Sequence, residues 1–123
     1  MKIKALLACI VFLSVTFMVQ AQGNGQRRTI EERVKEVMGK ITPALSLTAE
    51  QQVKTDSAFT QHYRGMQKLR EGLEQGTRPD RSQMEKLTAE RDEKLKLVLT
   101  DDQYKKFKDE VEATLRSQRG NRQ

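Results

Sequence analysis

His62 and Met66 stand four residues apart, a spacing that places two metal-ligating side chains on one face of a helix. An imidazole nitrogen and a thioether sulfur suit a soft or borderline metal ion. Two ligands do not complete a site, and the chain has no other histidine and no cysteine after Cys9. We therefore expect no bound metal and take His62 as a packed side chain, with a metal site at His62 and Met66 as the alternative.

Arg91 lies in the middle of an apolar stripe that runs from Met84 to Val98. An unpaired charge is costly to bury, so the position predicts a structural arginine that is paired with an acid such as Asp56. The alternative is that Arg91 lines an open binding surface.

No group of residues in the chain has the pattern of a catalytic site or of a cofactor site. The single histidine and the lack of cysteine after Cys9 exclude the usual zinc sites and thiol chemistry. Leu, Ile, Val and Phe supply only 18 of the 102 residues after Ala21, below the roughly 20% at which chains begin to look disordered. So thin a core excludes an ordinary α/β enzyme, and we expect no enzymatic activity and no cofactor.

The first 21 residues have the pattern of a secretory signal peptide. Lys2 and Lys4 precede an apolar stretch, and Ala21 ends a segment of the kind that signal peptidase cleaves. The stretch is shorter than the ~20 residues that a membrane span needs. We therefore expect residues 1–21 to be removed on export, which leaves a chain with 21 basic and 17 acidic residues, no disulfide and no membrane attachment.

Four helices are expected between a polar leader, residues 22–28, and a polar tail, residues 117–123, both of which we expect to be disordered. The first helix begins at Thr29 and stops at Pro43, and the others begin at Thr48, near Asp80 and at Asp101. Each carries its apolar residues on one stripe, and opposite charges four residues apart cover the rest. The pattern predicts an all-α domain over residues 29–116.

Two of these helices begin with the same motif, L-T-x-x-Q, 52 residues apart. The threonine hydroxyl caps a backbone N–H of the first turn, and the glutamine three residues later reaches back to the backbone N–H of the threonine. The leucine before the cap packs onto the first turn. The repeat predicts a helix–box–helix unit that is used twice, with motif residues Leu47, Thr48, Gln51, Leu99, Thr100 and Gln103.

With these two motifs the chain resembles the Spy/CpxP family of periplasmic stress proteins, most specifically over residues 91–103. The resemblance implies a periplasmic, four-helix, hooked protomer and an antiparallel homodimer shaped like a shallow cradle. It also implies a concave face that is both basic and apolar and holds unfolded clients without ATP. The family further contains inhibitors of envelope-stress sensor kinases and heavy-metal sensors, so the fold alone does not decide the function.

A chaperone surface attracts other chains through charge and holds them through adaptable apolar side chains. Phe59, Tyr63 and Met66 are the candidate apolar contacts for clients, and Arg64 and Lys68 flank them as candidate charges. The alternative for the three apolar residues is that they belong to the core or to a dimer interface.

The sequence thus predicts an exported, ATP-independent, chaperone-like stress protein that binds unfolded or partly folded clients and limits their aggregation. One alternative is a periplasmic regulatory partner that docks a basic face on an envelope-stress sensor kinase, and another is a periplasmic heavy-metal sensor. Nucleic acid is not an expected partner, because the basic residues are interleaved with acidic ones and the chain is exported.

Overall fold

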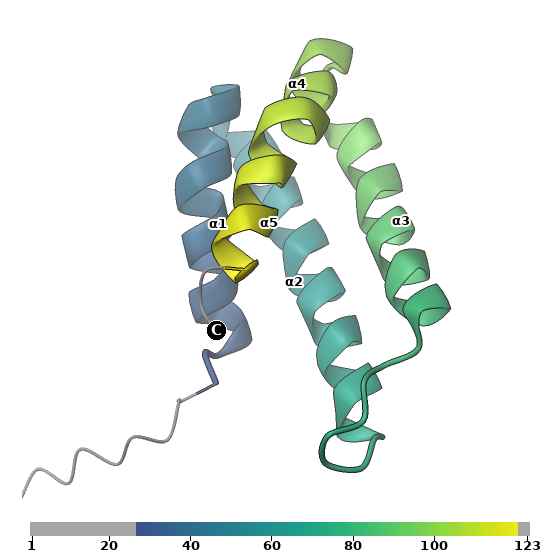
Figure 1. Cartoon of the computed structure of the whole chain (residues 1–123). Coiled ribbons are helices and arrows are strands. Elements are labelled where there is room, and N and C mark those ends of the chain that lie inside the picture. Colours follow the sequence, from purple (N-terminus) through teal and green to yellow (C-terminus); the bar gives the residue numbers. More distant parts are fainter. Residues whose placement is uncertain (1–26, 121–123) are drawn as a thin grey trace, which may run out of the picture.

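The computed structural model describes residues 27–120 (Figure 1). The expected signal peptide, residues 22–26 of the leader and residues 121–123 of the tail lie outside the described residues. The elements are α1 (Ile30–Leu45), α2 (Ala49–Glu71), α3 (Arg81–Val98), α4 (Asp101–Lys106), the π-helical turn η1 (Phe107–Val111) and α5 (Glu112–Gly120). No strand occurs between residues 27 and 120, so the chain is all-α there, as the sequence predicts.

The helices form two layers. In the first layer α2 lies between α1 and α3 and contacts both. The second layer is one continuous helical segment that joins α4, η1 and α5 and that we call the C-terminal arm. Figure 1 shows the arm descending from the end of α3 across α1 and α2, with η1 in contact with α1.

The core lies between these two layers. Its largest fully buried side chains include Phe59 from α2, Leu95 from α3 and Phe107 from the arm. The rings of Phe59 and Phe107 meet edge to face, with 6.2 Å between their centres. Because every helix supplies only a narrow apolar stripe, one tier of side chains fills the space between the layers.

Helices α1 and α3 both begin with a side-chain cap, and the cap of α1 is the one that the sequence predicts. Thr29 and Glu32 form a reciprocal capping box at α1, in which each side chain accepts a backbone N–H from the other residue. At α3 the carboxylate of Asp80 accepts the backbone N–H of Ser82. These side chains satisfy N–H groups that have no partner within the helix, which fixes where each helix begins.

Two expected helix ends are wrong. The first helix does not stop at Pro43 but continues to Leu45, and it ends at Ser46, which has a left-handed conformation with φ of 51°. A proline within a helix removes one backbone hydrogen bond, and the buried side chains of Ile41 and Leu45 on either side of Pro43 keep the last turn packed. The last helix continues through residues 117–120, which the sequence analysis assigned to a disordered tail.

The close approach of α3 to α2 depends on Gly65. A Cβ atom at this position would lie 2.7 Å from a terminal methyl carbon of Leu87, closer than packed carbon atoms come. The missing side chain lets Leu87 rest on the backbone of α2.

Within residues 27–120, no helix combines the length and the apolar character that crossing a membrane requires.

Candidate functional site

The two L-T-x-x-Q motifs form capping boxes at the starts of α2 and α4. Thr48 accepts the backbone N–H of Gln51 at 3.2 Å, and the side-chain oxygen of Gln51 accepts the backbone N–H of Thr48 at 3.1 Å. In the second box Thr100 accepts the backbone N–H of Gln103 at 3.2 Å, and the side-chain oxygen of Gln103 accepts the backbone N–H of Thr100 at 3.0 Å. Both boxes therefore fix a helix start in the same local geometry.

The fold brings the two boxes together through their glutamines. Nε2 of Gln51 donates to Oε1 of Gln103 at 2.7 Å, and Nε2 of Gln103 lies 3.2 Å from Oε1 of Gln51. Each amide also donates to a carbonyl at the end of the helix that precedes the other box: Gln51 to Val98 and Gln103 to Leu45. Two side chains thus connect the ends of α1 and α3 to the starts of α2 and α4.

The leucines of the motifs lie beneath this polar junction. Leu47 and Leu99 are both buried and belong to the core. Each motif therefore anchors its leucine in the core directly before its capping box. The repeated motif is thus both a pair of helix caps and the contact that joins the two halves of the chain.

A second polar cluster surrounds Arg91, which is buried at 7% exposure. Its guanidinium donates twice to one oxygen of Asp92, at 2.6 and 2.9 Å, and once to Glu112 at 3.3 Å. Its central carbon lies 5.3 Å from the ring centre of Phe59 and 5.5 Å from that of Phe107. These distances fit cation–π contacts, so the charge is stabilised by rings as well as by acids.

Two further cations complete the cluster. Lys108 bridges the two acids, at 2.8 Å from Asp92 and 2.6 Å from Glu112. Arg116 lies 3.1 Å from Glu112, one helical turn further on. The acids that pair with Arg91 are therefore Asp92 and Glu112 rather than Asp56, whose carboxylate accepts the hydroxyl of Thr60 on α2.

The pKa values of both acids are lowered. Burial alone raises the pKa of Asp92, but hydrogen bonds from Lys108 and Arg91 and the positive charges of both outweigh it. Burial likewise raises the pKa of Glu112, and the hydrogen bond and charge of Lys108, with the charges of Arg91 and Arg116, reverse the shift. The pKa of Lys108 is raised, because its bonds to the two acids outweigh the effect of burial. Asp92, Glu112 and Lys108 are therefore charged at neutral pH.

The sequence does not predict Glu112 as part of a site, because α-helical spacing does not place it there. On a regular helix Tyr104, Phe107 and Val111 share one face, and Glu112 points away from it. The π-helical turn changes this spacing and brings Glu112 over the core. Nothing in the spacing of the sequence marks that turn.

The candidate client-binding residues divide into buried and exposed ones. Phe59 and Tyr63 are core side chains with 1% and 8% exposure, so the expectation that they form an open contact surface is wrong for a folded protomer. Phe59 packs against Phe107 of the arm, and Phe59 and Tyr63 both belong to the core cluster. Met66 is half-buried, and Arg64 and Lys68 are exposed.

His62 and Met66 form no recognisable metal centre in the described chain. The buried ring of His62 has Nδ1 3.3 Å from the backbone carbonyl oxygen of Leu87, and it meets the ring of Tyr63 edge to face. Among residues 27–120, no group of three or more His, Cys, Asp or Glu side chains is arranged to hold a metal ion.

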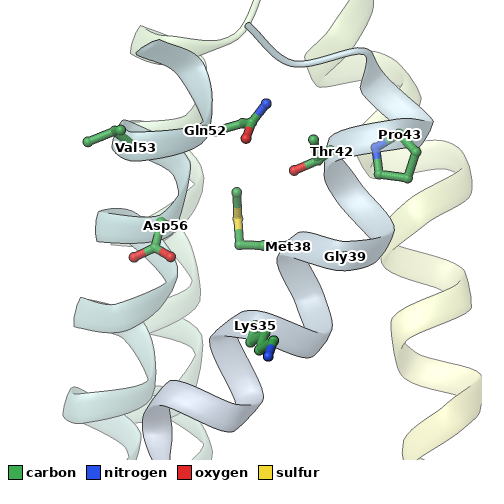
Figure 2. A pocket seen from close by; sticks show the side chains of 8 residues that line it. All are labelled: Lys35, Met38, Gly39, Thr42, Pro43, Gln52, Val53 and Asp56. Carbon is green, nitrogen blue, oxygen red and sulfur yellow. The ribbon is translucent and has the colours of Figure 1, made fainter. Parts of the chain in front are cut away.

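An open groove of about 670 Å³ runs between α1 and α2. Figure 2 shows the side chains of Met38 and Gln52 in the space between the two helices, with Lys35 on α1 and Asp56 on α2. Gln52 donates to the carbonyl of Leu47, which holds its amide in place. The groove has one group of each charge and offers no convergent set of catalytic residues.

Comparison with known protein families, with curated proteins and with solved structures finds no match to this chain.

The glutamine pair predicts coupled losses of stability. Gln51→Ala and Gln103→Ala should each lower the free energy of unfolding by about 1–2 kcal/mol, because each leaves partly buried partners without a hydrogen bond. The double variant should lose less than the sum, because both changes remove the same contact. Urea unfolding measures all three, with Gln67→Ala on the exposed face of α2 as the control. Strictly additive losses would show that the two amides act independently.

Replacing Arg91 should destabilise the domain by about 3 kcal/mol, because two acids then lose their buried partner. Arg91→Ala removes the charge and the ring contacts, whereas Arg91→Met keeps an apolar side chain against Phe59 and Phe107. Thermal melting of both variants separates the two contributions. An unchanged melting temperature in Arg91→Ala would contradict a structural role.

The lowered pKa values of Asp92 and Glu112 predict a loss of stability in acid. Their stabilising contribution is complete above the ordinary carboxyl pKa of about 4 and is lost as the pH falls through the lower values of the folded state. We expect the urea midpoint to fall more steeply below about pH 4 in the parent than in Glu112→Gln. Glu110→Gln, an exposed change on the same helix, should follow the parent. Parallel curves for the parent and Glu112→Gln would refute the assignment.

Proposed function

We propose that this protein is an exported, ATP-independent, chaperone-like stress protein of the periplasm that binds unfolded or partly folded clients. The proposal combines the resemblance carried by the two L-T-x-x-Q motifs with one structural observation. That observation is a row of apolar side chains on α2 and α3 outside the main core, called here the distal strip: Met66, Leu69, Leu73, Met84 and Leu87.

The distal strip is half-buried along its whole length. None of its residues belongs to the core cluster or to the partly buried side chains packed against that cluster. Figure 1 shows the reason: the arm ends part-way down α2, and the lower halves of α2 and α3 extend beyond it. The apolar row thus continues from the core onto the lower halves of α2 and α3, which α5 does not reach.

The chemistry of the strip suits weak and adaptable binding. Two of its five residues are methionines, whose flexible side chains fit partners of different shapes. Arg64 and Lys68 are exposed on either side of Met66 in the sequence and supply the positive charge that attracts acidic segments of a client. This surface replaces Phe59 and Tyr63 as the apolar part of the client site.

A dimer completes the proposal. The resemblance implies a hooked protomer and an antiparallel, cradle-shaped homodimer. A domain of this size with a single thin tier of core side chains is marginal alone, and association with a second copy is a common remedy. Two copies arranged in this way would carry two distal strips, which allows one client to be held at two points and raises the apparent affinity.

The test is suppression of aggregation by the purified mature chain, without ATP, with a reduced or heat-denatured client. We expect suppression at concentrations comparable to that of the client and a loss of several-fold in the double variant Met66→Ser/Met84→Ser. Leu97→Ser is the matched control, since Leu97 is 89% exposed on α3 and lies outside the strip.

Thermal melting of each variant establishes that it is folded at the assay temperature. Suppression that appears only at crowding concentrations, or none, would contradict the proposal and favour a regulatory partner of a sensor kinase. Equal loss in the Leu97→Ser control would show that the strip is not the client surface.

A further inference from the structure

The π-helical turn η1 interrupts the arm between α4 and α5. The backbone N–H of Glu112 donates to the carbonyl of Phe107, five residues earlier, instead of to the residue four positions back. Such a turn holds one residue more than an α-helical turn, and it is rare because α geometry is normally preferred. Every residue after it is therefore rotated by about 100° relative to an uninterrupted α-helix.

The rotation decides which side chains of α5 face the core. In continuous α geometry Glu112 would point about 140° away from Phe107 around the helix. In the structure Phe107, Val111 and Glu112 are all buried, and Leu115 packs against the core cluster. The π-helical turn thus brings a carboxylate into the interior together with the apolar stripe.

The contacts that hold this arrangement are ionic and come from both sides of the turn. Glu112 reaches Arg91 on α3, and it also pairs with Arg116 one turn further along α5. Lys108, within η1 itself, joins Glu112 to Asp92. Without the charge on Glu112, Arg91 and Lys108 lose a partner and the wide turn loses the contacts that offset its unfavourable geometry.

We infer that η1 is a register switch that the ion pair between Glu112 and Arg91 holds in its wide form. When that pair is broken, the turn relaxes to an α-helix and α5 rotates out of its docked position. Leu115 is then turned by about 100° away from its packed position, whereas Val111, four residues after Phe107, stays on the face that Phe107 occupies. The inference rests on the fold alone and stands independently of the proposed function.

Hydrogen exchange of the backbone amides tests the switch. In Glu112→Gln, which keeps the shape and removes the charge, the protection of residues 112–118 should fall at least ~10-fold. The amides of α2 and α3 should keep the protection that they have in the parent. Glu110→Gln is the matched control, because Glu110 is exposed within the same turn. Unchanged protection of residues 112–118 in Glu112→Gln would overturn the inference.

Deletion of Asp109 distinguishes a register switch from the simple loss of an ion pair. Asp109 is exposed within η1, and its removal lets an ordinary α-helix place Glu112 four residues after Phe107, in the docked register. The deletion should therefore restore the protection of α5 in the Glu112→Gln background. If it does not, the π-helical turn is not the switch. If Glu112→Gln unfolds the whole domain, the deletion of Asp109 is tested in that variant by thermal melting. Restored folding supports the inference, and continued unfolding overturns it.

Discussion

The carboxamides of Gln51 and Gln103 hydrogen-bond to each other at the point where two helices end and two others begin. Each carboxamide caps its own helix and binds the last turn of the helix before the other box. The contact therefore fixes the relative position of four helix ends with two side chains. Because the same arrangement occurs twice, the halves α1–α2 and α3–α4 meet as two copies of one helix–box–helix unit.

This junction has large consequences because the core is thin. Apolar contacts have little directional preference, so a thin core alone does not distinguish one arrangement of the helices from similar ones. Hydrogen bonds between buried groups do have direction, and a misplaced helix would leave them unmade at a cost of about 1–3 kcal/mol each. The glutamine pair at one end and the Arg91 cluster near the middle thus select one packing, while the apolar residues supply most of the burial.

The two polar features differ in how far the sequence predicts them. The caps at Thr48 and Thr100 are local, because a threonine and a glutamine three residues apart already contain the whole box. Their mutual contact is not local, since neither motif predicts that the two glutamines meet. The burial of Arg91 follows from its place in an apolar stripe, but its partner Glu112 depends on a helical turn with one extra residue. Spacing arguments that assume 3.6 residues per turn cannot find such a partner.

The other differences have the same origin in tertiary contacts. Pro43 interrupts the backbone hydrogen bonds of α1, yet the helix continues because Ile41 and Leu45 are anchored in the core. The sequence of α2 alone does not show whether Phe59 and Tyr63 are exposed, because their burial depends on the other helices of the core. Propensity and periodicity describe one helix at a time, whereas burial is decided by the neighbouring helix.

The length of the arm relates the fold to the proposed function. The arm meets α2 at Phe59, whose ring packs against that of Phe107, and Figure 1 shows α5 ending part-way down α2 while the lower parts of α2 and α3 extend beyond it. Under the proposed function the uncovered strip is the client surface, so an arm that covered it would leave less apolar surface for binding. A thin domain that leaves part of its apolar stripe uncovered gives up some stability, and under the proposed function that uncovered part is the surface that receives clients. Arg64 and Lys68 are exposed next to Met66 in the sequence, and they supply the positive charge that the proposed function requires beside the strip.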